Sequence, residues 1–113
     1  MHELAIAEGI IGIVRSEAQR NKFSRVIEIK LMVGEFSGIV PEYILELFPA
    51  AAKGTPAEGA SVDISVLPAE FQCRACSYEG PVDRKKACCP LCGSEDLKMT
   101  VGRELYVDSM KVE

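Results

Sequence analysis

The sequence has a single histidine, His2, among 113 residues. It also has no nucleophile elbow and no glycine-rich loop that would cradle a phosphate group. Enzyme active sites are usually assembled from groups of these kinds. Carboxylates alone are too common to define a catalytic site, so these absences argue against an enzyme.

Long hydrophobic runs are missing as well. No apolar stretch approaches the ~20 residues that a membrane-spanning helix requires. Glu3 and Glu8 lie where a secretory signal would carry basic residues, and no small-residue cleavage pattern follows them. We therefore expect a cytoplasmic protein without a membrane anchor.

Basic residues are outnumbered, with 13 Lys and Arg against 17 Asp and Glu and a formal net charge of −4. Affinity for nucleic acid rests largely on neutralising phosphates with basic side chains. The one basic cluster, Arg84, Lys85 and Lys86, is typical of a solvated loop and could also serve as a docking patch. A zinc ribbon that binds nucleic acid remains an alternative, but the charge favours a protein or a small ion as the partner.

Apolar residues recur at helical spacing from Glu3 to about Arg20, which predicts an amphipathic helix. Its expected buried stripe comprises Leu4, Ile6, Ala7, Ile10, Ile11, Ile13, Val14 and Ala18. Gly9 and Gly12 each cost about 1 kcal/mol relative to alanine inside a helix. These glycines favour a close approach of a neighbouring element, and simple tolerance is the alternative.

Three segments alternate between apolar and polar residues, as half-buried strands do. The apolar positions are Ile27, Ile29, Leu31 and Val33 in the first segment, Val62, Ile64 and Val66 in the second, and Leu105, Val107, Met110 and Val112 in the third. The third alternation slips by one residue near Asp108, which predicts a bulge. Residues 34–40 read as a loop, and Pro41 suits the first turn of a second helix. Pro49 should kink or interrupt that helix.

This order of elements predicts an α+β fold in which two helices pack on a small three-stranded mixed sheet. The cysteine-rich segment is expected as a zinc-ribbon module inserted between two strands of that sheet. We place one domain at residues 1–68 plus 102–113 and the inserted domain at residues 69–101.

Four of the five cysteines form two pairs with a two-residue gap, Cys73 with Cys76 and Cys89 with Cys92. Such a gap lets a tight turn present two thiolates to one tetrahedral ion, and this spacing is typical of structural zinc sites. Four thiolates leave no coordination position for water or substrate. The zinc should therefore stabilise the module rather than catalyse a reaction.

Several alternatives remain at this site. Tetrahedral sulfur ligation also suits iron, and CPLCG resembles half of a rubredoxin site. Cys88 could replace its neighbour Cys89 as a ligand, although the two-residue gap favours Cys89. Gly93 follows the second pair and can take a positive φ that helps backbone N–H groups approach the thiolates, and Ser77 holds the equivalent place after the first pair.

The amino terminus offers a second metal site. The amine of Met1, the backbone nitrogens and the imidazole of His2 can form adjoining chelate rings around nickel or copper, which prefer nitrogen ligands. Glu3, Glu35 or Glu42 could add oxygen ligands. A lone terminal histidine is, however, more often simply a frayed residue.

Five motifs fall in an order that resembles the HypA/HybF family of nickel-insertion accessory proteins, which serve [NiFe]-hydrogenase maturation. They are the opening MHELAIA, the loop GEFSGIVPE, the turn GTPAEGA, and the cysteine pairs CRAC and CPLC. The resemblance covers essentially the whole chain.

The resemblance implies a metallochaperone rather than an enzyme. It implies transient nickel binding by Met1, His2 and Glu3 in the larger domain, with structural zinc on Cys73, Cys76, Cys89 and Cys92. It further implies two partners, a nickel-binding maturation GTPase and the [NiFe]-hydrogenase large subunit. Val40 stands where some relatives carry a carboxylate, so a nickel ligand from that loop is not expected here.

Overall fold

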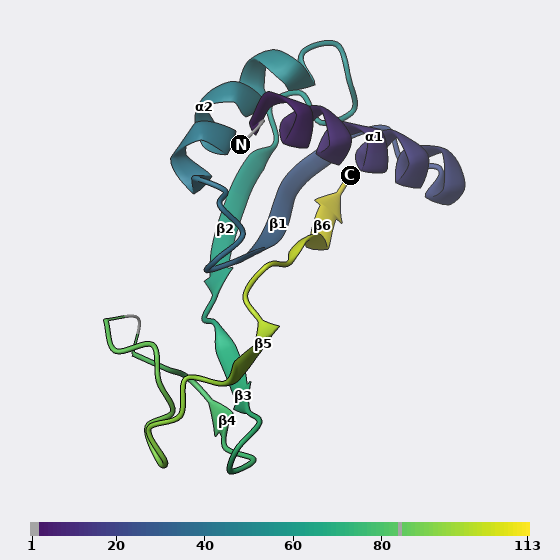
Figure 1. The fold of residues 1–113 in the computed structure, drawn as a ribbon. Helices are drawn as coiled ribbons and strands as arrows, with labels where there is room; N and C mark the ends of the chain where they lie inside the picture. The colour runs from purple at the N-terminus through teal and green to yellow at the C-terminus, as the bar shows by residue number, and fades with distance from the viewer. Residues whose placement is uncertain (1–2, 84) are drawn as a thin grey trace. The chain divides into compact units, whose positions relative to one another are not determined.

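A computed structural model describes residues 3–83 and 85–113 of the chain (Figure 1). The elements follow in the order α1 (Glu3–Asn21), β1 (Val26–Gly34), α2 (Pro41–Ala52), β2 (Ser61–Leu67), β3 (Glu70–Cys73), β4 (Glu79–Gly80), β5 (Leu97–Val101) and β6 (Leu105–Val112). Within the described residues, no helix is long and apolar enough to cross a membrane.

The chain divides into two compact units. The first unit consists of Met1–Met32, Gly38–Ser65 and Tyr106–Glu113, and the second consists of Val33–Ser37 and Val66–Leu105. The short segment Val33–Ser37 thus packs with the cysteine-rich part of the chain. The functional domains at residues 1–68 plus 102–113 and 69–101 stay a prediction.

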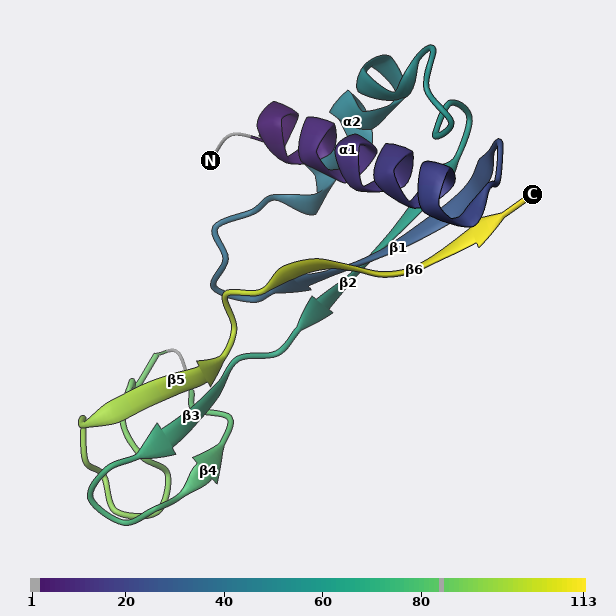
Figure 2. The same ribbon diagram turned by 90° about the vertical axis from the view of Figure 1, so that its right-hand side faces the viewer.

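The first unit contains a three-stranded sheet in the order β2-β1-β6. Both helices cover the same face of this sheet (Figure 2). β1 and β2 point the same way, since α2 connects them, and β6 runs opposite to β1 (Figure 1). Arg25 accepts a hydrogen bond from the N–H of Glu113, while the N–H of Gly34 donates to Glu104, as an antiparallel pair requires. The predicted α+β fold with two helices on a mixed sheet is confirmed.

The core of this unit lies between the helices and the sheet. Val14 of α1, Ile29 and Leu31 of β1, and Ile44 and Phe48 of α2 are each at most 2% exposed. Burying side chains of this size stabilises the fold by about 1.5–3 kcal/mol each. The predicted helical stripe is confirmed at its centre, because Ala7, Ile10, Ile11 and Val14 are buried.

Several details of α1 differ from the prediction. A Cβ atom at Gly9 or Gly12 would meet nothing within 4 Å, so no neighbouring element approaches these glycines closely among the described residues. Leu4 and Ile13 are 50% and 46% exposed rather than buried. All four residues are exposed.

The predictions for the two prolines of α2 have different outcomes. Pro41 lies at the start of the helix, as expected. The predicted interruption at Pro49 is wrong, because α2 continues through it to Ala52. Proline removes the N–H that would bond to Leu45, but Phe48 and Ala52 on either side are buried and hold the helix against the core.

Two strands of the first unit lose strict alternation. Val26 is fully buried whereas Ile27 is 44% exposed, so the expected burial of Ile27 is wrong. In β6, Val107 and Met110 both pack against the core although they are three residues apart. Residues three apart share a face only where the alternation slips, as we expected near Asp108.

The second unit contains its own sheet, in the order β4-β3-β5, which the sequence pattern did not predict. β3 pairs antiparallel with both neighbours. The cysteine-rich segment follows β2 and precedes β6, so the prediction of an insertion between two strands of one sheet is confirmed.

Candidate metal centre

Two turns of nearly identical construction carry the four paired cysteines. In the first turn, the carbonyl of Cys73 accepts a hydrogen bond of 3.0 Å from the N–H of Ser77. In the second, the carbonyl of Cys89 accepts one of 2.9 Å from the N–H of Gly93. Ser77 and Gly93 have φ values of 66° and 76°, so both residues turn the chain in the left-handed region. The predicted equivalence of Ser77 and Gly93 is confirmed.

One further hydrogen bond closes each turn. The N–H of Cys73 donates to the carbonyl of Tyr78 at 2.8 Å, and the N–H of Cys89 donates to that of Ser94 at 2.8 Å. The sequence did not predict that the carbonyls of Tyr78 and Ser94 would accept these hydrogen bonds. A signal was available, since each stands five residues after the first cysteine of its pair.

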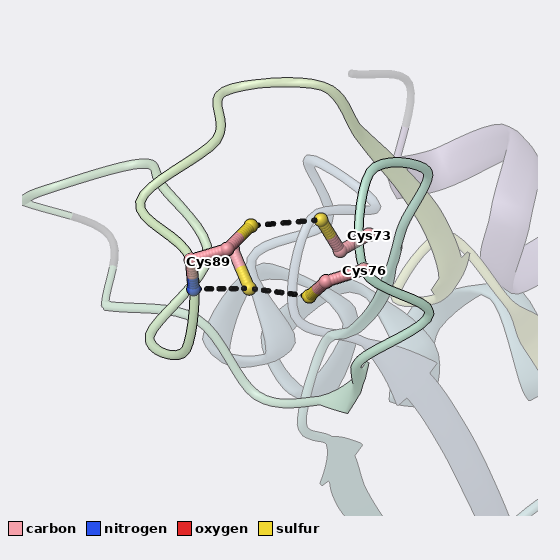
Figure 3. A group of neighbouring side chains, drawn as sticks. Cys73, Cys76 and Cys89 are labelled. Carbon is pink, nitrogen blue, oxygen red and sulfur yellow. Dashed lines mark hydrogen bonds between the residues drawn. The ribbon is translucent and has the colours of Figure 1, made fainter.

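The two turns face each other and bring four sulfur atoms together (Figure 3). The Sγ atoms of Cys73 and Cys92 lie 3.6 Å apart, and those of Cys76 and Cys89 lie 3.5 Å apart. All four lie within 4.8 Å of one another. A regular tetrahedron of sulfurs around an ion at about 2.3 Å has edges of about 3.8 Å. The arrangement therefore fits one tetrahedral ion.

The turns are held together by β3, β5 and one polar contact. Cys73 at the end of β3 pairs with Leu97 at the start of β5. The N–H of Arg74 donates to the carbonyl of Asp96 at 3.0 Å, and their side chains lie 3.7 Å apart. Because this ion pair is exposed, it contributes little to stability. The backbone pairing sets the distance between the turns.

Backbone N–H groups point at one of the sulfurs. The Sγ of Cys89 accepts from the N–H groups of Leu91 and Cys92 at 3.4 and 3.5 Å. Burial acts to raise the pKa of the Cys89 thiol, but the N–H groups of Cys92 and Leu91 prevail and lower this pKa to about 6. Such donors stabilise a thiolate, which is the form that binds a metal.

The thiol of Cys76 behaves in the opposite way. The backbone hydrogen bond from Tyr78 acts to lower its pKa, but the neighbouring thiol of Cys89 and desolvation raise the pKa to about 12. A second negative charge beside an existing thiolate is unfavourable without a cation between them. A divalent ion supplies that charge, so metal binding should release protons from the cluster.

Cys88 does not belong to the cluster. The set of neighbouring ligand atoms comprises Cys73, Cys76, Cys89 and Cys92. Cys88 is partly exposed and a free thiol. In the described part of the chain, the structure thus brings together the four cysteines that the two-residue gaps predict and leaves the fifth aside.

The predicted amino-terminal site is described only in part. Met1 and His2 lie outside the described residues. Glu3 is 8% exposed, and its Oε2 accepts a hydrogen bond of 3.4 Å from the N–H of Val40. This contact joins the first residue of α1 to the residue that precedes α2. Sequence reasoning did not anticipate it.

The two other carboxylates considered for this site have different settings. Oε1 of Glu35 accepts a hydrogen bond of 2.8 Å from the N–H of Ala69, and both residues belong to the second compact unit. Glu42 is exposed in the first turn of α2. The Glu35 carboxylate therefore has a structural partner in its own unit.

The sequence matches a known protein family. The model of the family described as "Hydrogenase/urease nickel incorporation, metallochaperone, hypA" matches residues 1–112. "Hydrogenase maturation factor HypA" of Methylocella silvestris is 39% identical over 113 residues, which is 100% of each chain. The factor of the same name from Dehalococcoides mccartyi is 30% identical over 100% of this chain and 95% of its own.

Two solved structures share the fold. "Solution structure of HypA protein" gives a TM-score of 0.76 at 22% identity, with 100% of this chain and 97% of that chain covered. The Ni metallochaperone HypA from Helicobacter pylori gives a TM-score of 0.71 at 21% identity, with coverage of 99% and 97%. The family match over residues 1–112 and the full-length relatives together confirm the resemblance seen in the sequence, and the chain belongs to the HypA family of nickel metallochaperones for hydrogenase maturation.

Proposed function

We propose that this chain binds Ni(II) at its amino terminus and helps to deliver it to the large subunit of a [NiFe]-hydrogenase. The nickel ligands are Met1, His2 and Glu3. The observation that carries the proposal is membership of a nickel-incorporation family in a chain whose only histidine is His2. A carrier must release its cargo, and a site with one imidazole ligand suits exchange better than permanent retention.

The setting of Glu3 supports this position for the site. Its nearly buried side chain begins α1 and contacts the backbone of Val40, so the residue next to His2 is attached to the fold. Copper generally exceeds nickel in affinity for nitrogen ligands. Selectivity for nickel must therefore come from geometry, from metal availability and from the partner that receives the metal.

We assign the cysteine cluster to one structural zinc ion, held by Cys73, Cys76, Cys89 and Cys92. The sulfur arrangement supports a closed tetrahedral site with no open position. The cluster belongs to the domain at residues 69–101, and the nickel site belongs to the domain at residues 1–68 plus 102–113. Iron would colour the protein red, and zinc leaves it colourless.

Membership of the family supports the remaining assignments of the proposal. The partners are a nickel-binding maturation GTPase and the hydrogenase large subunit, and the protein is a cytoplasmic metallochaperone without an enzymatic activity of its own. Neither nucleic acid nor a membrane is a partner, in keeping with the net charge of −4.

A nickel titration tests the proposal. The native chain and the His2→Ala variant are first loaded with zinc, so that nickel cannot occupy the cysteine cluster, and zinc content is measured in each. His2→Ala should lose at least about tenfold in nickel affinity while zinc stays near one per chain. Glu46→Ala is the matched control, because it removes an exposed carboxylate that is not a candidate nickel ligand and should leave the affinity unchanged. Equal nickel affinity of native and His2→Ala proteins would refute the site.

A further inference from the structure

The second compact unit has an apolar pocket that the metal sites do not use. Its volume is about 260 Å³. It is lined by Phe36, Phe71, Val82, Asp83, Ala87, Leu97 and Met99. All seven residues belong to the same compact unit. Six of them are apolar, so the pocket suits an apolar group rather than an ion or a sugar.

The walls of the pocket come from paired strands and one aromatic contact. Phe71 of β3 lies opposite Met99 of β5 in the antiparallel ladder. The ring of Phe36 meets that of Phe71 edge to face, with centroids 6.2 Å apart and planes at 74°. These two walls are therefore preformed. Yet Phe36, Phe71 and Met99 are only half-buried, so apolar area that a partner could cover stays in contact with water.

Hydrogen bonds among the described residues support the rim of the pocket. Oδ1 of Asp83 accepts from the N–H of Lys85 at 2.9 Å, and the carbonyl of Asp83 accepts from Lys86 and Ala87 at 3.1 and 2.9 Å. Ala87 has a φ of 49°, in the left-handed region. The one carboxylate in the lining is thus committed to the turn. Its single negative charge is outnumbered by the two lysines at the rim, Lys85 and Lys86.

Positive charge gathers at this rim. Lys85 and Lys86 are exposed and lie between two lining residues, Asp83 and Ala87. Arg84 completes the basic cluster in the sequence but lies outside the described residues. The chain as a whole is acidic, with a net charge of −4, so this short basic segment is exceptional. Its charge favours an acidic partner segment over a basic one.

We infer that this pocket docks an apolar side chain presented by an acidic segment of a partner protein. The apolar side chain fills the space between Phe71 and Met99, and its acidic neighbours face Lys85 and Lys86. A protein segment fits better than a nucleic acid, because the basic surface is confined to one turn and phosphate contacts need a wider one. The inference is independent of where nickel binds.

Amide NMR spectra of the zinc-loaded full chain provide the test. The probe is a short peptide of aspartates and glutamates around a central phenylalanine, with end groups blocked. Two matched peptides carry a central alanine, or lysines in place of the acidic residues. The acidic phenylalanine peptide should shift the amides of the pocket residues and bind at least about tenfold more tightly than either control peptide.

Two variants separate the contributions. The double variant Lys85→Glu with Lys86→Glu should bind the acidic phenylalanine peptide more weakly. The control Lys53→Glu with Lys111→Glu makes the same charge change in the first unit and should bind this peptide as the native chain does. Ala87→Leu should fill the pocket and abolish the preference for phenylalanine, with zinc content as the check on folding. Equal binding of all three peptides, shifts confined to other residues, or tighter binding of a single-stranded oligonucleotide at the same amides would overturn the inference.

Discussion

Replacing Cys73 with serine should unfold the second compact unit while the first remains folded. Cys73 is 1% exposed, and its sulfur lies 3.6 Å from that of Cys92. The substitution leaves three thiolates and removes the closed tetrahedral set. Structural zinc contributes about 10–16 kcal/mol in small zinc-binding peptides. That value is comparable with the about 5–15 kcal/mol by which whole domains are stable.

The distribution of buried residues explains why the two units should respond differently. In the part of the second unit that the structure describes, the buried hydrophobic residues are Val33, Ala69, Cys73 and Cys89. Two of these four are members of the cluster. Once the metal is lost, little apolar burial remains to offset the chain entropy of ordering this unit. The first unit keeps a core with Ile29, Leu31 and Ile44, which does not depend on the metal.

Hydrogen exchange followed by mass spectrometry can separate the two units. Peptides that cover Glu70–Cys73 and Leu97–Val101 should lose protection in Cys73→Ser, and removal of zinc by a chelator should have the same effect on the native chain. Peptides from α1 and β1 should keep their protection. Cys88→Ser is the matched control and should behave as the native chain. Full protection of β3 and β5 in metal-free Cys73→Ser would refute the reasoning.

Further predictions concern the core, the backbone and the dependence on pH. Ile44→Ala should lower the free energy of unfolding by about 2–5 kcal/mol in urea titrations, because Ile44 is fully buried, and should leave zinc content unchanged. Gly34→Ala should destabilise the chain in the same assay, because a Cβ there would overlap the carbonyl of Gly102; full native stability would contradict this. The N–H of Gly102 lowers the pKa of Glu104 below its ordinary 4.5. The ionised Glu104 carboxylate therefore stabilises the folded chain at neutral pH, and this contribution is lost as pH falls through the folded-state pKa. The stability difference between native and Glu104→Gln proteins should therefore shrink in acid, and a constant difference would exclude this role.

The sequence predicts well what depends on local patterns. Helical spacing of apolar residues predicted α1 and its buried Ala7 and Val14, and the loop before Pro41 preceded a helix as expected. The two-residue gaps predicted which four sulfurs would meet, because a tight turn determines their geometry with few distant contacts. The same two-residue gap favoured Cys89 over Cys88 as a member of the cluster.

What the sequence did not predict depends on contacts between distant segments. The pairing of Phe71 with Met99 joins residues on either side of both cysteine turns, and no periodic pattern announces it. The contact of Glu3 with Val40 depends on how α1 packs beside α2. Gly9 and Gly12 face open space, and their identity alone does not distinguish close packing from exposure.

The central claim is that the free amino terminus itself binds nickel, and a chain extended by four glycines before Met1 tests it most directly. This extension keeps every side chain, including His2 and Glu3, but places the amine too far from His2 to close adjoining chelate rings with it. A single added glycine would not serve, because histidine as the third residue forms a new amino-terminal nickel site. In zinc-loaded protein, the extended chain should bind nickel at least about tenfold more weakly than the native chain, with zinc content unchanged. Nickel affinity equal to that of the native chain would contradict the account.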